Sequence, residues 1–334
     1  MKRAHVRLPS PGIRCKRDLR EFATIALVQR ARTAIAAGLG LTAFAGLVWI
    51  GVAIASDPVP STAPSAAPPG PIEQAVSRGQ HLRIDGPRGP VHVWIPANYH
   101  ADTGATILYI HGYYDNVDTA WTGHQLPEQF AASALNAVFV APEAPVSNRS
   151  GVNYPDLGEL LRLVEEKTGV PRGAALTVAM GHSGAFRTLE SWLDEPLLDQ
   201  IVMIDAMYGD EDKIIAWYKA SPTHRLIMIG EDTILGGEGI AQKLPEAFTI
   251  DRFPPTYDLC PAEARTSRLV YLRAQFSHMA LVMEGIVMPS VMRLLPVERL
   301  VDGPWKLPMG PLTPGPDAAM VTDDAGLAGS GSAN

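Results

Sequence analysis

A serine between small residues stands where an apolar stretch gives way to a helical pattern. The segment Leu176–Ala185 reads LTVAMGHSGA, and apolar side chains recur at helical spacing directly after it. A serine held in a sharp strand-to-helix turn projects its hydroxyl above a sheet, and the next backbone N–H is then free to bind an oxyanion. The pattern therefore indicates that Ser183 attacks an acyl carbonyl, with the N–H of Gly184 as one oxyanion donor.

This segment resembles the nucleophile elbow of the α/β-hydrolase superfamily, which contains serine esterases, lipases, amidases and peptidases. The resemblance covers roughly Gln80 to Leu295, and the elbow follows the fifth of eight expected strands, as in that superfamily. Ala185 replaces the final glycine of the usual pattern, and its methyl group is small enough for the turn. The resemblance implies a catalytic triad and no cofactor.

The third expected strand is followed by His111-Gly112-Tyr113. A glycine after a buried strand lets the backbone approach a substrate closely, so Gly112 belongs to the expected binding site. By resemblance to the superfamily, the N–H of Tyr113 is the second oxyanion donor beside that of Gly184. His111 is expected to order this loop rather than to transfer protons.

The resemblance also implies a general base on the loop after the last strand, where His278 is the only histidine. A neutral imidazole at that point can take the proton of Ser183 and return it to the leaving group. The alternative interpretation is a histidine at a helix start with no part in the chemistry.

The acid of the triad is less well determined, because the superfamily places it after the sixth or the seventh strand and both are followed by carboxylates here. Asp205 directly follows a wholly apolar strand, where a charge needs a partner such as His278. We therefore expect Asp205 to be the acid. Asp232 stays open as the alternative, with Glu231 and Asp210 behind it.

The elements that must position these residues follow from an alternation of apolar runs and helical patterns. Unbroken apolar runs are typical of strands covered on both faces, and the first two runs predict an antiparallel hairpin around Gly86–Gly89. The order predicts an α/β fold, an eight-stranded mostly parallel sheet flanked by helices. The expected strands are His81–Ile84, Val91–Ile95, Thr106–Ile110, Ala137–Val140, Leu176–Met180, Ile201–Ile204, Leu226–Ile229 and Leu269–Leu272, and the clearest helices are Asp156–Lys167, Ala185–Leu193 and His278–Leu295.

The N-terminal part of the chain predicts a membrane anchor. Residues 1–33 carry nine Lys or Arg and two acids, a net +7, so the rest of the chain sums to −14 within a total of −7. Residues 34–55 carry no charge, and at about 1.5 Å per residue they span roughly 33 Å, the thickness of a bilayer core. We expect a single-pass transmembrane helix over Ala34–Ala55 with the catalytic domain outside the cytoplasm, periplasmic or extracellular. Cleavage after Ala55, giving a secreted protein, is the alternative.

The remaining domain boundaries are inferred from changes in amino-acid composition. We expect a proline-rich linker over 56–71, the hydrolase-like domain over 72–300 and a flexible tail over 301–334. The net charge of −14 on the residues after position 33 argues against a nucleic-acid partner. The chain has two cysteines, Cys15 and Cys260, and no sequence pattern typical of a metal or nucleotide site, so neither a disulfide framework nor a metal or cofactor is expected.

Together these features predict a membrane-tethered serine hydrolase acting on carboxylic esters of a small-molecule or lipid-like acyl substrate. Two alternatives remain open at this level. An amidase or peptidase would use the same triad, and a non-catalytic binding module could use the same fold.

Overall fold

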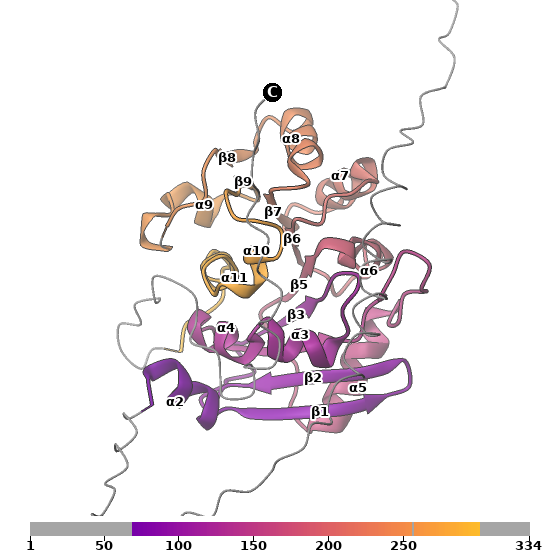
Figure 1. Cartoon of the computed structure of the whole chain (residues 1–334), viewed down its shortest axis with the longest axis vertical. Helices are drawn as coiled ribbons and strands as arrows, with labels where there is room; N and C mark the ends of the chain where they lie inside the picture. The colour runs from indigo at the N-terminus through magenta and orange to yellow at the C-terminus, as the bar shows by residue number, and fades with distance from the viewer. Residues whose placement is uncertain (1–68, 256, 301–334) are drawn as a thin grey trace, which may run out of the picture. The chain divides into compact units, whose positions relative to one another are not determined.

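One mixed sheet of nine strands organises the computed structural model, which describes residues 69–255 and 257–300 (Figure 1). The strand order is β1-β2-β4-β3-β5-β6-β7-β9-β8. Strand β2 is antiparallel to both of its neighbours, and all other neighbouring pairs are parallel. The strands are β1 (Gln80–Gly86), β2 (Gly89–Ile95), β3 (Ala105–Ile110), β4 (Ala137–Pro142), β5 (Thr177–His182), β6 (Gln200–Ile204), β7 (Arg225–Gly230), β8 (Phe248–Ile250) and β9 (Leu269–Arg273).

The central strands are buried on both faces, which explains their unbroken apolar sequences. On β3, Ile107 and Tyr109 pack into one hydrophobic cluster, while Leu108 and Ile110 pack into another on the opposite face. The first cluster includes residues from α3 (Val117–Gly123), α4 (Leu126–Ser133), α9 (Ala262–Thr266), α10 (Ala280–Met283) and α11 (Val287–Met292), with α2 (Pro71–Arg78) packed against it. The second includes residues from α5 (Leu157–Thr168), α6 (Phe186–Ser191), α7 (Glu211–Ala220) and α8 (Ile234–Lys243). Residues 69–255 and 257–300 also contain two 3-10 helices, η1 (Ser183–Ala185) and η2 (Tyr257–Leu259).

All eight expected strands are present, but the expected number of strands is wrong by one. Strand β8 pairs with β9 at the sheet edge and has only three residues, none of them buried. So short and exposed a strand has no apolar run that the sequence pattern could reveal. The sheet is also mixed, since β2 runs against its neighbours, as the predicted hairpin requires.

The predicted helix His278–Leu295 is wrong as a single element. Two short helices, α10 and α11, occupy this segment, and Gly285 lies between them with φ of +66°. A residue in the left-handed region ends a helix, and glycine adopts that conformation without steric cost. The prediction for Asp156–Lys167 is confirmed as α5, with Asp156 as its N-cap accepting a hydrogen bond from the N–H of Glu159.

The predicted membrane segment and its basic flank lie outside the residues that the structure describes. No helix within residues 69–255 and 257–300 has both the length and the apolar character needed to cross a bilayer. The predicted basic head (1–33), the anchor Ala34–Ala55, nearly all of the linker and the tail 301–334 lie outside the described residues.

Candidate active site

The turn between β5 and α6 holds Ser183 in a conformation that few non-glycine residues adopt. Its φ is +54°, in the left-handed region, and the 3-10 helix η1 begins at this residue. Such strain persists where the surroundings impose it, and it is concentrated at functional sites. The small neighbours explain how the turn closes: a Cβ on Gly181 would lie 2.8 Å from Leu189 Cδ1 and 3.0 Å from Ala185 Cβ. The structure therefore has a sharp, strained turn from strand to helix at Ser183.

The loop after β3 approaches this turn closely. A Cβ on Gly112 would lie 2.8 Å from the Cβ of Ser183, so only glycine allows the approach. The ring of Tyr113 covers Gly184, where an added Cβ would lie 2.4 Å from Tyr113 Cδ1. The two backbone segments expected to supply oxyanion donors thus lie against one another beside Ser183.

His278 and Asp205 meet at the carboxyl end of the sheet, although 73 positions separate them in the sequence. Nδ1 of His278 lies 2.7 Å from Oδ2 of Asp205, whose side chain is fully buried. Asp205 has φ of +47°, so its backbone, like that of Ser183, lies in the left-handed region. The bend lets its carboxylate accept hydrogen bonds from the loop after β7, namely from the N–H groups of Glu231, Asp232 and Thr233 and from the Thr233 hydroxyl.

These contacts decide the charge states of the pair. Burial by itself would raise the pKa of Asp205, but the hydrogen bonds from His278 and from three backbone N–H groups outweigh it and hold the pKa well below its usual value. Burial lowers the pKa of His278. The hydrogen bond to Asp205 and the negative charges of Asp205, Asp232 and Glu231 raise this pKa by more than burial lowers it, so the net shift is upward. Asp205 is thus a fixed carboxylate that favours a protonated imidazole at His278.

The other acids considered from the sequence lie in different surroundings. Asp232 Oδ2 is 3.5 Å from Nδ1 of His278, and the Asp232 side chain is 56% exposed. A hydrogen bond to Asp232 raises the pKa of the neighbouring Glu231. Asp210 pairs with Lys213 at the start of α7, 2.9 Å away. Asp205 is therefore the acid in direct contact with His278, and Asp232 lies beside the pair.

His182, which the sequence reasoning did not select, joins the base loop to the elbow. Its Nε2 lies 3.2 Å from the carbonyl oxygen of His278, and the two imidazole rings are 4.5 Å apart between centroids. Burial and the neighbouring charges of His278 and His124 lower the pKa of His182 to about 3, so its ring is neutral and donates to that carbonyl. His278 is therefore held next to the residue that precedes Ser183.

Tyr208, also not selected from the sequence, is a neighbour of Ser183. Burial raises the pKa of Tyr208 to about 12, with the charge of Asp205 acting in the same direction and a hydrogen bond with Ser183 opposing it. The ring is half exposed and lies 5.9 Å from that of Phe186. Within the described part of the chain no hydrogen bond joins Ser183 to His278. Catalytic hydrogen bonds often form fully only with substrate present.

One group of side chains among the described residues has the composition of a metal site, namely Asp205, Asp232 and His278, whose ligand atoms lie within 4.8 Å of one another. The oxygens of Asp205 already accept five hydrogen bonds, four from the β7 loop and one from His278. Such a carboxylate has little lone-pair density left for a cation, so the arrangement fits an acid–imidazole pair better than a metal centre.

Among known proteins, only solved structures show a similarity to this chain. No family model matches the chain, and no curated protein matches it. The chain is similar to a mutant feruloyl esterase module from Clostridium thermocellum complexed with sinapinate, at 13% identity and a TM-score of 0.45, covering 67% of this chain and 91% of that one. It is also similar to an esterase from Pyrobaculum calidifontis, at 13% identity and a TM-score of 0.39, covering 63% and 81%.

An S-formylglutathione hydrolase from Agrobacterium tumefaciens gives a similar result, at 8% identity and a TM-score of 0.41, covering 64% of this chain and 92% of that one. At such identities and scores, the reaction of this chain has to be argued from its own side chains. These three similar structures are members of the α/β-hydrolase superfamily.

Proposed function

We propose that this protein is a serine hydrolase that cleaves carboxylic esters, with Ser183 as nucleophile, His278 as general base and Asp205 as the acid. The observation that carries the proposal is the 2.7 Å contact between His278 and the buried Asp205, at the sheet edge where the strained Ser183 follows β5. A nucleophile, a base and a group that orients the base are the parts that acyl transfer needs.

The proposed reaction has two half-reactions. As Ser183 Oγ attacks the ester carbonyl, its proton passes to Nε2 of His278, and the N–H groups of Tyr113 and Gly184 stabilise the tetrahedral oxyanion. Collapse of this intermediate breaks the ester C–O bond, and the imidazolium returns the proton to the departing alcohol. Water then attacks the acyl-enzyme with His278 as base, the acid is released and Ser183 regains its proton.

The role of Asp205 follows from its surroundings. Its low pKa keeps it ionised, and its contact with Nδ1 fixes the tautomer of His278 whose Nε2 accepts the proton. The negative charge also stabilises the imidazolium formed during attack. Asp232, solvated and 3.5 Å from the same nitrogen, adds charge without fixing the ring.

The test is turnover of p-nitrophenyl esters of increasing acyl length by the full-length chain, beside the matching p-nitroanilides. We expect ester hydrolysis that Ser183→Ala abolishes while the circular dichroism spectrum stays unchanged. Faster cleavage of anilides than of esters would favour an amidase or peptidase. A folded wild-type protein that cleaves neither class would contradict the proposal and favour a binding module.

We further propose that Ala34–Ala55 tethers the catalytic domain to a membrane, with that domain outside the cytoplasm. The support is the uncharged length of this segment and the net +7 of residues 1–33. The full-length protein should remain in the membrane fraction after alkaline carbonate washing. Release of a protein that begins after Ala55 would instead indicate a cleaved signal peptide.

A further inference from the structure

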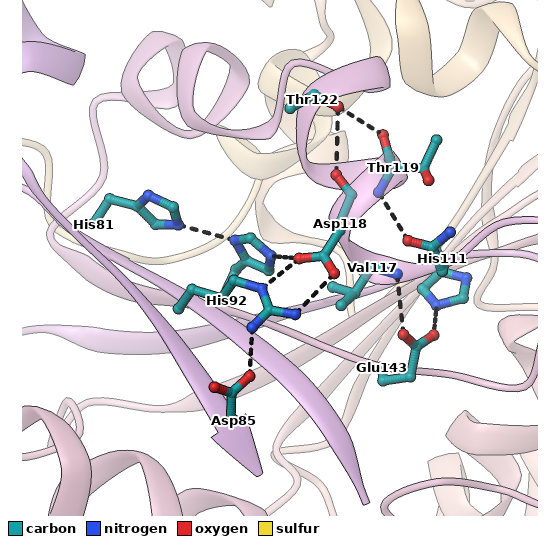
Figure 2. A network of polar contacts seen from close by, with 11 residues as sticks. His81, Asp85, His92, His111, Val117, Asp118, Thr119, Thr122 and Glu143 are labelled. Atoms are coloured by element: carbon teal, nitrogen blue, oxygen red, sulfur yellow. Dashed lines mark hydrogen bonds and ion pairs between the residues drawn. The ribbon is translucent and has the colours of Figure 1, made fainter.

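A buried histidine and a glutamate lie directly behind the loop that supplies one proposed oxyanion donor. Nδ1 of His111 is 2.8 Å from the carbonyl oxygen of Gly112. On the other side of the ring, Nε2 is 2.9 Å from Oε1 of Glu143 (Figure 2). The His111 side chain is 1% exposed and that of Glu143 is 13% exposed. His111 comes from the end of β3, and Glu143 follows β4, the parallel neighbour of β3.

The hydrogen-bond partners determine where the protons lie. A carbonyl oxygen only accepts, so Nδ1 of His111 carries a proton and donates it to Gly112. Nε2 lies 2.9 Å from Oε1 of Glu143, and a proton shared between the two atoms removes the repulsion of two bare lone pairs. The N–H of Ala144 lies beside both atoms, 3.0 Å from Nε2 of His111 and 3.2 Å from Oε1 of Glu143. Glu143 and Ala144 therefore hold the ring of His111 with its Nδ1–H directed at the carbonyl of Gly112.

The peptide group that receives this hydrogen bond is the one proposed to bind the oxyanion. The carbonyl of Gly112 and the N–H of Tyr113 belong to a single planar unit, and the described residues contain no cis peptide bond, so the two groups point in opposite directions. Fixing the carbonyl on His111 fixes the direction of the Tyr113 N–H. A hydrogen bond donated to the carbonyl also polarises the unit and strengthens its N–H as a donor.

The same carboxylate also contacts the far end of the loop. Oε2 of Glu143 lies 3.4 Å from the N–H of Val117, the first residue of α3, so one side chain links both ends of the segment His111–Val117. The backbone of Glu143 is fixed in turn, since its N–H donates to the carbonyl of Pro90 at 2.9 Å. A Cβ on Gly89 would lie only 2.7 Å from the Glu143 Cβ, so the hairpin packs tightly against this residue.

We propose that Glu143 is a positioning residue for catalysis: through His111 it orients and polarises the Gly112–Tyr113 peptide, whose N–H stabilises the oxyanion. The proposal rests on the proposed esterase function. Glu143 touches neither the nucleophile nor the reacting carbonyl, so its loss weakens transition-state stabilisation and leaves substrate binding almost unchanged.

The test is Glu143→Gln in the full-length protein, which keeps the shape of the side chain and removes its charge. Loss of an entire oxyanion donor costs about 10²–10³ in kcat, so weakening one should lower kcat by about 10- to 100-fold with KM within about twofold. The inhibition constant of an aliphatic trifluoromethyl ketone, which adds to a serine hydroxyl to give a tetrahedral oxyanion, should rise by the same factor. A purely structural defect would not move these two quantities in proportion.

A neighbouring carboxylate supplies the control. Asp118, in the first turn of α3, binds Arg83 and His92 on the β1–β2 hairpin instead of the loop (Figure 2). Asp118→Asn should leave kcat within about threefold of the wild type. Rates are expressed per site titrated with a fluorophosphonate, so that unfolded protein does not count.

A double-mutant cycle tests whether Glu143 acts through His111. Glu143→Gln and His111→Gln should each lower kcat, and the double variant should be no slower than the slower single variant. If Glu143→Gln does not fold, His111→Gln carries the same expectation for kcat and for the ketone. A kcat within threefold of wild type in the folded variant, additive losses, or an unchanged inhibition constant would overturn the proposal. A wild-type protein that neither hydrolyses esters nor reacts with fluorophosphonate would instead refute the proposed function.

Discussion

Oδ2 of Asp205 lies 2.7 Å from Nδ1 of His278, whereas Oδ2 of Asp232 lies 3.5 Å from the same nitrogen. Asp205 is fully buried and held by the N–H groups of the β7 loop, while more than half of the Asp232 side chain is exposed. A carboxylate fixed by several donors orients an imidazole, and a solvated one changes mainly the local charge. Loss of the two carboxylates should therefore affect the reaction in different ways.

Asp205→Asn should lower kcat for ester hydrolysis by about 10³–10⁴-fold, because an amide no longer stabilises the imidazolium or selects the productive tautomer of His278. Asp232→Asn should lower kcat by less than about tenfold. Steady-state kinetics of both variants on one p-nitrophenyl ester measures the difference, with thermal melts to verify folding. Near-normal turnover in Asp205→Asn together with a large loss in Asp232→Asn would reverse the assignment of the acid.

The pH dependence of kcat/KM should follow the deprotonation of His278. Its pKa is raised above the usual value, so activity increases as pH rises through that pKa and the base loses its proton. The charge of Asp232 contributes to the upward shift, and Asp232→Asn should therefore move the acidic limb to lower pH. Asp102→Asn, on the loop before β3, should leave the midpoint where it is. A midpoint unchanged in Asp232→Asn, or moved to higher pH, would exclude His278 as the titrating group.

Gly181 and Ala185 should interact directly in the elbow. Gly181→Ala introduces a methyl group 3.0 Å from Ala185 Cβ and 2.8 Å from Leu189 Cδ1, so it should lower the free energy of unfolding by about 1–3 kcal/mol and slow turnover. Ala185→Gly in the same molecule removes one of these contacts and should restore part of both losses. Urea unfolding of the two single variants and the double variant measures the coupling. Purely additive effects would mean that the two positions do not touch.

Tyr208 should restrict the room above the nucleophile. Its ring is 48% exposed, its hydroxyl contacts Ser183, and Phe186 lies beside it. Tyr208→Ala should raise the ratio of kcat/KM for a bulky ester to that for an acetate ester by about tenfold, since one missing hydrophobic contact is worth about 1–3 kcal/mol in selectivity. Tyr208→Phe keeps the ring and should leave the ratio within about twofold. Equal ratios in all three proteins would remove Tyr208 from the substrate path.

The sheet was largely predictable because its central strands are buried on both faces, which leaves unbroken apolar runs such as Thr106–Ile110 and Ile201–Ile204. The elbow was predictable because strand, small residues and helix are contiguous in the sequence. Strand β8 was not, since three partly exposed residues carry no periodic signal. The break at Gly285 was missed because the apolar spacing of His278–Leu295 continues across a residue whose φ is positive.

The candidate site was predictable only where its parts are local in sequence. The choice between Asp205 and Asp232 depends on the bend at Asp205, which turns its carboxylate toward the N–H groups of another loop. That bend has no signal in a single sequence. Glu143 lay outside the predicted set for a related reason, since its partner His111 is 32 positions away and contacts it only because β3 and β4 are neighbours.

The central claim is that the hydroxyl of Ser183 is an activated nucleophile, and covalent labelling tests it most directly. The full-length protein is incubated with a fluorophosphonate at neutral pH, and the modified residue is located by peptide mass spectrometry. The account predicts modification of Ser183 alone among the serines, much slower labelling in His278→Gln and none in Ser183→Ala. A folded protein that stays unlabelled, or one modified at another serine, would contradict it.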